Sequence, residues 1–301
     1  MSSWLFSEDA FIKELPLRKQ KVPVTAELCQ RELIHAFLIS LGSKLKLDGR
    51  TILAATIYIN RYYMRLPITS SKYFVALAAL AILCKLHENY RQPGKIALHA
   101  ANLKNPPGHA VIDEQSEGFW KWRDQLLYRE ELILKTLNFD LNLDLPYDIR
   151  DRIVEAQEEN NEDEVVIDSD TFKAAITLLE ILLSLPLYVA YDCYTALGMA
   201  LVIVSWEKKE PLPLSWLEKR LGVTGEMCYE CYCYVLRLIK YAKSDANLML
   251  NKMVAKRIPN VPKEVWGLLP ETESKDNLSA PTSQANPEPV SKPVESAPIN
   301  S

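Results

Sequence analysis

The segment that most constrains the fold covers residues 71–86 and reads SKYFVALAALAILCKL. Wound as an α-helix, it is apolar on nearly every side, which is typical of a helix that is buried among its neighbours. The apolar stretches of the chain are broken by polar residues before they reach the roughly 20 residues that a membrane crossing needs. We therefore expect residues 71–86 to be the central helix of a bundle.

Helical periodicity also dominates the rest of the first half of the chain. Glycine is scarce, with nine residues, and apolar side chains recur at intervals of three and four, which predicts an all-α fold. We expect a short helix within residues 1–25 and a five-helix bundle over residues 26–147. Its helices are expected at about residues 26–46, 49–66, 71–86, 95–103 and 117–138. Side-chain oxygens that can cap free backbone N–H groups precede four of the expected helices, at Ser7, Thr25, Asp48 and Ser116.

A similar pattern restarts in the second half of the chain. We expect residues 148–168 to be an acidic connector, because their charge density is too high for a core. Residues 169–268 then form a second bundle with at least four helices. Residues 269–301 are rich in serine, proline, asparagine and glutamate, which predicts a disordered tail. Helices of the second bundle are expected at about residues 171–185, 189–206, 213–221 and 226–241.

Charge and composition argue against several classes of function. A net charge of −4 and a pI near 5.7 leave no overall basic field to hold nucleic acid or an anionic membrane. The amino terminus has neither the basic lead nor the long apolar core of a secretory signal, and the cysteines are scattered. We therefore expect a soluble intracellular protein that contacts neither nucleic acid nor a membrane directly.

The sequence assigns no catalytic, cofactor-binding or metal-binding residue. An enzyme would need a nucleophile beside a base, or a metal constellation, and neither is visible. The C-x-x-C spacing of Cys228 and Cys231 is not accompanied by a second pair at zinc spacing. We interpret these two cysteines as small buried side chains on a helix.

One carboxylate interrupts an apolar stripe. Glu130 stands in the helix expected at 117–138, at a position where the 3.6-residue period calls for an apolar side chain. A buried carboxylate needs a counter-charge or hydrogen-bond donors. Lys85, at one end of the central helix, is a candidate partner. Lys85 could also be an ordinary helix terminus that extends its ammonium group into water.

Four stretches of the chain together resemble the cyclin box, most closely that of the transcriptional cyclins T and K and their fungal relatives. The resemblance is clear over residues 4–147 and weak over residues 165–250, where SWEKKEP at residues 205–211 carries most of it. It implies two consecutive five-helix cyclin folds. The four stretches are WLFSEDAF at 4–11, AATIYINRYY at 54–63, CKLHE at 84–88 and EELILKTLNFDL at 130–141.

The resemblance also implies a function and a binding site. Lys85 and Glu130 occupy the positions with which cyclins grip a cyclin-dependent kinase, and Glu88 is a further contact. The chain is then the regulatory subunit of a nuclear heterodimer, without chemistry of its own, that activates a kinase acting on the C-terminal tail of RNA polymerase II. Two residues depart from the family pattern, because His87 replaces a frequent acidic residue and Asn138 replaces a usual glycine.

Two other classes of function stay open at this point. A general transcription factor built from two cyclin-like repeats would bind promoter DNA, but such a protein is expected to be basic and to carry a zinc ribbon. A helical scaffold without a kinase is the second alternative. Copurification of a kinase separates both from a cyclin. The choice of kinase, and the choice between initiation and elongation, do not follow from these residues.

Overall fold

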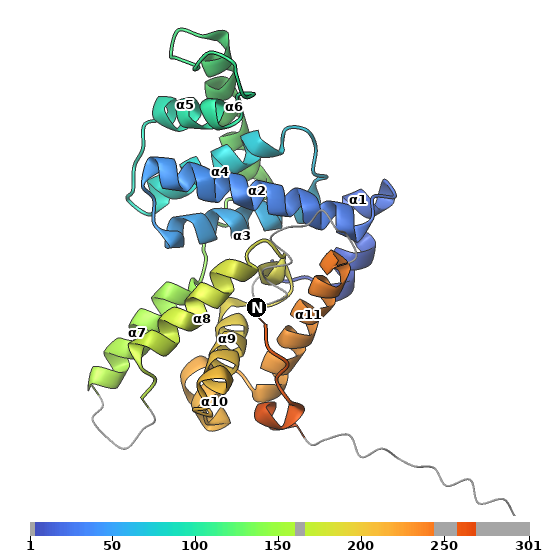
Figure 1. Cartoon of the computed structure of the whole chain (residues 1–301), viewed down its shortest axis with the longest axis vertical. Coiled ribbons are helices and arrows are strands. Elements are labelled where there is room, and N and C mark those ends of the chain that lie inside the picture. Colours follow the sequence, from blue (N-terminus) through green and yellow to red (C-terminus); the bar gives the residue numbers. More distant parts are fainter. Residues whose placement is uncertain (1–3, 160–165, 244–257, 269–301) are drawn as a thin grey trace, which may run out of the picture. The chain divides into compact units, whose positions relative to one another are not determined.

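The computed structural model describes residues 4–159, 166–243 and 258–268. These residues are largely helical and contain no β-strand, so the all-α prediction is confirmed (Figure 1). The predicted tail at 269–301 lies outside the described residues. The α-helices and short π or 3-10 helices (η) are η1 (Ala10–Glu14), α1 (Pro16–Lys19), α2 (Val24–Leu45), α3 (Gly49–Arg65), α4 (Lys72–Leu86), α5 (Pro93–Leu103), α6 (Glu117–Thr136), α7 (Pro146–Glu159), α8 (Ser169–Leu182), η2 (Leu187–Val189), α9 (Cys193–Lys208), α10 (Leu214–Leu221), α11 (Gly225–Lys243) and η3 (Lys263–Trp266).

Helix α4 is the centre of the first bundle. Residues 75–84 are all buried, and α2, α3, α5 and α6 pack around them. This confirms the central helix predicted from the all-round apolar character of the segment. Four helices can bury an apolar helix at low cost, because the backbone N–H and C=O groups in its interior are paired by its own hydrogen bonds.

Helix caps set the entry points of the elements. Asp48 accepts a hydrogen bond from the backbone N–H of Thr51 at 2.8 Å, and Ser116 caps α6 through the N–H of Phe119 at 3.3 Å. Both caps were predicted from the sequence and are confirmed. The expected cap at Thr25 is wrong, because α2 already begins at Val24, directly after Pro23.

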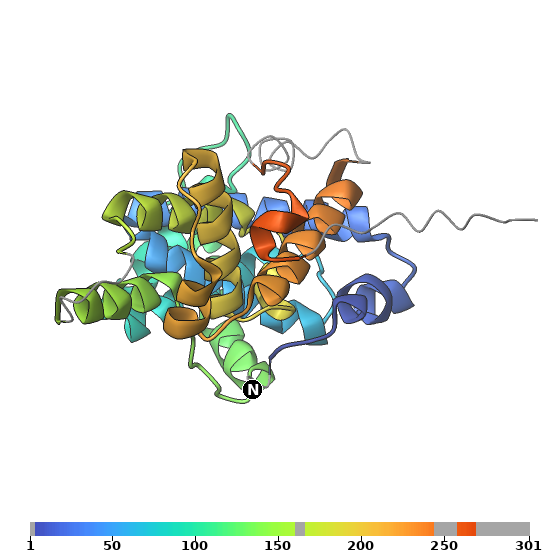
Figure 2. The same ribbon diagram turned by 90° about the horizontal axis from the view of Figure 1, so that it is seen from below.

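Helix α9 plays the same central part in the second bundle. Residues 195–205 are buried, and α7, α8, α10 and α11 contact this helix. The views from two directions place α9 between α8 and α11 (Figures 1 and 2). The second bundle thus repeats the plan of the first, with an apolar helix surrounded by amphipathic ones.

Helix α7 corrects the predicted connector. The sequence assigned residues 148–168 to an acidic connector, yet α7 covers the first part of this segment. Ile149 and Ile153 are four residues apart and only 2% and 5% exposed, so they form the buried face that packs towards α8 and α9. Because charged residues surround the two isoleucines, their helical spacing was not recognised in the sequence. Residues 160–165 lie outside the described part of the chain. All described residues belong to one compact unit. The remaining domain boundaries stay predictions.

The segment before α2 touches both bundles. Trp4 is buried and donates its indole N–H to Asp140 at 2.9 Å. The backbone N–H of Phe6 donates to the carbonyl of Val189 at 2.7 Å. The predicted cap at Ser7 is confirmed, since its hydroxyl oxygen accepts a backbone N–H at 3.2 Å. These contacts hold the leading segment against elements from both halves of the chain.

Candidate functional site

Lys85, in the last turn of α4, bonds Glu130, the carboxylate that interrupts the apolar face of α6. Lys85 Nζ lies 2.9 Å from Oε1 and 3.0 Å from Oε2 of Glu130, so one ammonium group serves both carboxylate oxygens. Residues 45 positions apart meet because α4 and α6 pack against each other. The contact proposed from the sequence is therefore confirmed.

Burial is unequal across this pair. The Glu130 side chain is 11% exposed, while the Lys85 side chain is 49% exposed. Glu130 belongs to the buried face of α6, as the interrupted stripe predicted. A lysine ammonium has three N–H donors, and the two bonds to Glu130 leave one for another acceptor. The pair therefore presents an oriented cation at the surface, backed by a buried anion.

Two exposed leucines flank the charged pair. Leu86 follows Lys85 directly, and Leu127 lies three residues before Glu130, hence on the same side of α6. Their exposed fractions are 46% and 47%. Protein interfaces combine apolar side chains at their core with polar and charged groups towards their rim. We call Lys85, Leu86, Leu127 and Glu130 the α4–α6 patch.

Glu88 lies in the loop after α4 and is exposed. Its backbone adopts φ = 55°, in the left-handed region that residues other than glycine rarely adopt. The structure brings Lys85 and Glu130 into direct contact, whereas Glu88 is near them only as the third residue after Lys85. Its side chain is thus available to a partner rather than used inside the bundle.

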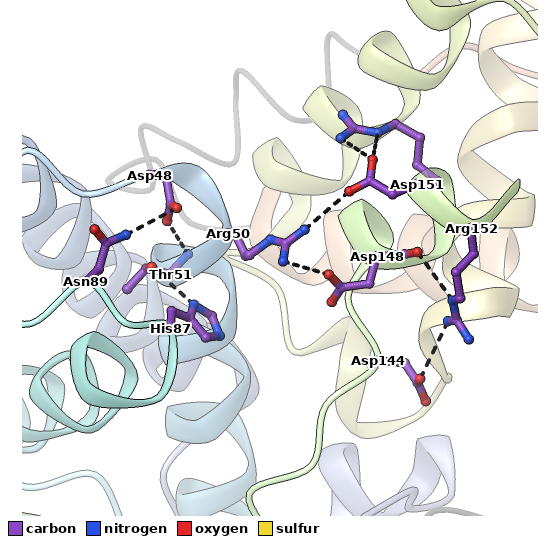
Figure 3. A network of polar contacts seen from close by, with 10 residues as sticks. Asp48, Arg50, Thr51, His87, Asn89, Asp144, Asp148, Asp151 and Arg152 are labelled. Carbon is purple, nitrogen blue, oxygen red and sulfur yellow. Dashed lines mark hydrogen bonds and ion pairs between the residues drawn. The ribbon is translucent and has the colours of Figure 1, made fainter. Parts of the chain in front are cut away.

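The loop that carries Glu88 is attached to the start of α3 (Figure 3). Thr51 Oγ1 lies 3.2 Å from Nδ1 of His87, and the Asn89 amide donates to Asp48 Oδ2 at 3.4 Å. Burial lowers the pKa of His87 below its usual value, and the Asp48 carboxylate opposes this shift only in part. The Thr51 hydroxyl can donate to an unprotonated Nδ1 of His87 or accept from a protonated one.

Further attachment comes from Arg91 at the other end of the loop. Its Nε donates to the carbonyl of Leu45 at 3.0 Å, at the carboxyl end of α2. A guanidinium group is well placed there, because the last carbonyls of a helix lack intrahelical partners. These loop contacts could not be predicted from the sequence, since they join residues that only the packed bundle brings together.

The described residues offer no alternative site for metal chemistry. No group of three or more His, Cys, Asp or Glu residues among them could hold a metal ion. Cys228 and Cys231 are fully buried on α11, as predicted, and burial raises the pKa of the Cys231 thiol well above its usual value. No helix in the described part of the chain is long and apolar enough to cross a membrane.

The first bundle is similar to a known protein family. The family model of the cyclin N-terminal domain matches residues 11–142. This match covers less than half of the chain, and Lys85, Glu88 and Glu130 all lie inside it.

Related proteins are cyclins, several of them cyclins T, as the sequence resemblance implied. Cyclin pch1 of Schizosaccharomyces pombe is 31% identical over 147 residues, which make up 48% of this chain and 43% of that protein. Cyclin-T1 of Homo sapiens is 31% identical over 150 residues, 48% of this chain and 20% of that protein. Cyclin-T1-3 of Arabidopsis thaliana is 27% identical, covering 48% and 47%. The matches thus span less than half of the length of these relatives.

The likeness of fold extends beyond the residues that the family model matches. A chain in the crystal structure of the yeast RNA polymerase II CTD kinase CTDK-1 complex superposes with a TM-score of 0.63 at 16% sequence identity. The superposition covers 92% of this chain and 93% of that one. The two bundles together therefore have the fold of that protein, although the second bundle has little sequence signal.

Proposed function

We propose that this chain is a regulatory cyclin subunit that binds and activates a cyclin-dependent kinase through the α4–α6 patch. The observation that carries the proposal is the pair of Lys85 and Glu130, in which a buried carboxylate orients a half-exposed ammonium group. This pair lies within the residues that match the cyclin N-terminal domain. An oriented N–H donor beside exposed leucines suits a backbone carbonyl and apolar side chains of a partner helix.

The mechanism requires binding energy rather than chemistry from this subunit. A protein kinase is active when one of its helices is placed so that a glutamate pairs with the catalytic lysine. A subunit that binds only this state shifts the kinase population towards it. To move the population from 1% to 99% active, the preference for the active state must be about 5.5 kcal/mol. The chain then contributes no catalytic group.

The kinase partner that we propose phosphorylates the C-terminal tail of RNA polymerase II, and the complex works in the nucleus. The supporting observation is the kinship with the T-type cyclins and with cyclin pch1. In this proposal the polymerase tail is a substrate of the complex, and the chain itself makes no direct contact with nucleic acid. A net charge of −4 is consistent with that division of roles.

The test is copurification of the tagged chain from nuclear extract, followed by mass spectrometry and a kinase assay on a polymerase-tail peptide. We expect a cyclin-dependent kinase to be recovered with the wild type and to be lost with Lys85→Glu. Lys173→Glu is the matched control, because Lys173 forms an exposed ion pair with Asp170 at 3.1 Å in the second bundle.

Each alternative gives a different result in the same experiment. Recovery of no kinase from the wild type favours a helical scaffold. Tight, salt-sensitive binding of the isolated chain to promoter DNA favours a general transcription factor. If Lys85→Glu and Lys173→Glu recover the kinase equally, the chain is a cyclin but the α4–α6 patch is not its kinase-binding surface.

A further inference from the structure

The first residues of α3 connect two parts of the molecule that the sequence does not relate. Asp48 and Thr51 bond the loop after α4, whereas Gly49 and Arg50 meet α7 and α8 of the second bundle (Figure 3). We call residues 48–51 the α3 turn. It stands between the loop that carries Glu88 and the second bundle.

On the loop side, both neighbours of Glu88 are attached to the α3 turn. His87 bonds the hydroxyl of Thr51 at 3.2 Å, and Asn89 donates to Asp48 at 3.4 Å. Glu88 lies between these two attachments with its backbone at φ = 55°. A glutamate keeps such a conformation only where its surroundings impose it, because its Cβ is crowded in the left-handed region.

On the other side, the second bundle holds the α3 turn in place. Arg50 forms an ion pair with Asp148 at 2.7 Å and lies 3.5 Å from Asp151, both on α7. The backbone at Gly49 packs so closely that an added Cβ would collide with Tyr147 and Glu180. Tyr147 in turn donates its hydroxyl to Glu180. The turn is thus fixed by contacts independent of the loop.

We propose that Thr51 and Asp48 are positioning residues for kinase binding. They hold His87 and Asn89, and thereby fix the direction in which Glu88 leaves the bundle beside the α4–α6 patch. This inference rests on the proposed cyclin function and on Glu88 as a kinase contact. In this proposal, contacts from the second bundle stabilise the α3 turn. The α3 turn in turn positions the kinase-binding loop of the first bundle.

The physical basis is preorganisation. A loop that already has its bound shape loses less conformational freedom on binding than a loop that must be ordered by the partner. Removal of one attachment leaves the strained backbone at Glu88 free to relax into a more common conformation. The kinase would then bind a fraction of the molecules, which lowers the apparent affinity by that fraction.

The decisive comparison is between Thr51→Val and Thr51→Ser. Valine keeps the shape of the fully buried Thr51 side chain but removes the hydroxyl, whereas serine keeps the hydroxyl. We expect Thr51→Val to weaken binding of the copurified kinase by about 2- to 10-fold, the effect of one hydrogen bond, and Thr51→Ser to bind like the wild type. Asn89→Ala, in the half-buried loop, is expected to act in the same direction.

A double-mutant cycle with Glu88→Ala separates positioning from general destabilisation. If Thr51 acts through Glu88, then Thr51→Val has no further effect on kinase affinity once Glu88→Ala is present. Equal effects in both backgrounds, or equal affinities of the valine and serine variants, overturn the inference. Failure of the cyclin proposal looks different, because the wild type would then bind no kinase and Lys85→Glu would change nothing.

Discussion

The central helices of the two bundles both carry a lysine in their last turn, but the two lysines have different surroundings. Lys85 at the end of α4 bonds Glu130 of α6 and keeps 49% of its side chain exposed. Lys208 at the end of α9 donates to the Thr171 hydroxyl at 2.6 Å and lies 3.3 Å from Asp168. Asp168 is the residue that caps α8. Lys208 therefore reinforces a helix start within its own bundle.

This difference separates a binding group from a brace. In the second bundle the lysine meets a carboxylate that already accepts a backbone N–H, and its exposed fraction is 33%. In the first bundle the lysine is held by a buried carboxylate and is flanked by exposed leucines. A lysine at the end of an apolar helix thus has no fixed role; the neighbouring helix determines it.

The largest expected effect tests this comparison directly. We expect Lys85→Glu to weaken kinase binding by about 2 to 5 kcal/mol, the range for truncating one side of a buried charged pair at an interface. Lys208→Glu is expected to leave kinase binding within about 0.5 kcal/mol of the wild type. Titration calorimetry with the purified kinase measures both. A comparable loss in both variants would remove the distinction between the bundles.

The effect of Lys85→Glu on folding must be measured beside its effect on kinase binding, because Glu130 is largely buried. A fully exposed pair would contribute about 0 to 1 kcal/mol to the free energy of unfolding. The Glu130 side chain is only 11% exposed. Lys85→Glu therefore places a second negative charge beside a largely buried carboxylate, which lowers the free energy of unfolding further. The double variant Lys85→Glu with Glu130→Lys is expected to recover folding without recovering kinase binding. Recovery of both would mean that the pair is only a brace.

A second difference between the bundles is their response to acid. All four histidines lie within residues 35–109, and His35 is buried on α2. Burial lowers the pKa of His35 to about 4. The unfolded chain, with a histidine pKa near 6.5, therefore binds more protons than the folded chain between these values.

Stability is consequently full above pH 6.5 and decreases as the pH falls towards 4. His35 alone is expected to account for about 3 kcal/mol of this decrease, because its pKa is near 6.5 in the unfolded chain and about 4 in the folded one. Urea unfolding at pH 7 and pH 4.5 measures it. His35→Asn is expected to flatten the dependence, while the exposed His109→Asn control keeps it. An unchanged slope in His35→Asn would assign the acid sensitivity to other groups.

Helix caps provide a smaller test. Asp168→Ala removes the cap of α8 and the carboxylate partner of Lys208. Ser116→Ala removes the cap of α6 and the hydrogen bond that the Ser116 hydroxyl donates to the carbonyl of Asp113. We expect the aspartate variant to lose about 1 to 2 kcal/mol of unfolding free energy and the serine variant about 0.5 to 1 kcal/mol. Thermal unfolding followed by circular dichroism compares them. An equal loss would mean that Lys208 adds nothing to the cap.

The smallest expected effect concerns two glycines. An added Cβ at Gly198 on α9 would approach the Cys228 sulfur to 2.8 Å, while one at Gly94 on α5 would meet only ordinary contact at 3.7 Å. Gly94→Ala is therefore expected to stabilise the protein by up to about 1 kcal/mol, as alanine does in helices. Gly198→Ala is expected to destabilise it by about 1 kcal/mol, because overpacking outweighs that gain. Chemical unfolding of the pair gives the two signs, and equal signs would contradict the tight α9–α11 contact.

Much of the helical plan was encoded locally. The all-round apolar character of α4 predicted its central place, and the side chains of Asp48 and Ser116 predicted two helix starts. Glu130 in an apolar stripe even indicated the contact with Lys85. These features could be predicted because helical periodicity and capping depend on residues only three or four positions apart.

Other features depend on contacts between distant residues, and only the tertiary structure decided them. The many acidic residues of α7 led to its prediction as a connector. Its two isoleucines are buried because α8 and α9 pack against them. The bonds that His87 and Asn89, the neighbours of Glu88, form with the α3 turn join residues 36 to 41 positions apart in the sequence. The different roles of Lys85 and Lys208 likewise follow from which helix packs beside each. A single sequence specifies local periods, but the burial and pairing of a charge depend on the packing of the whole chain.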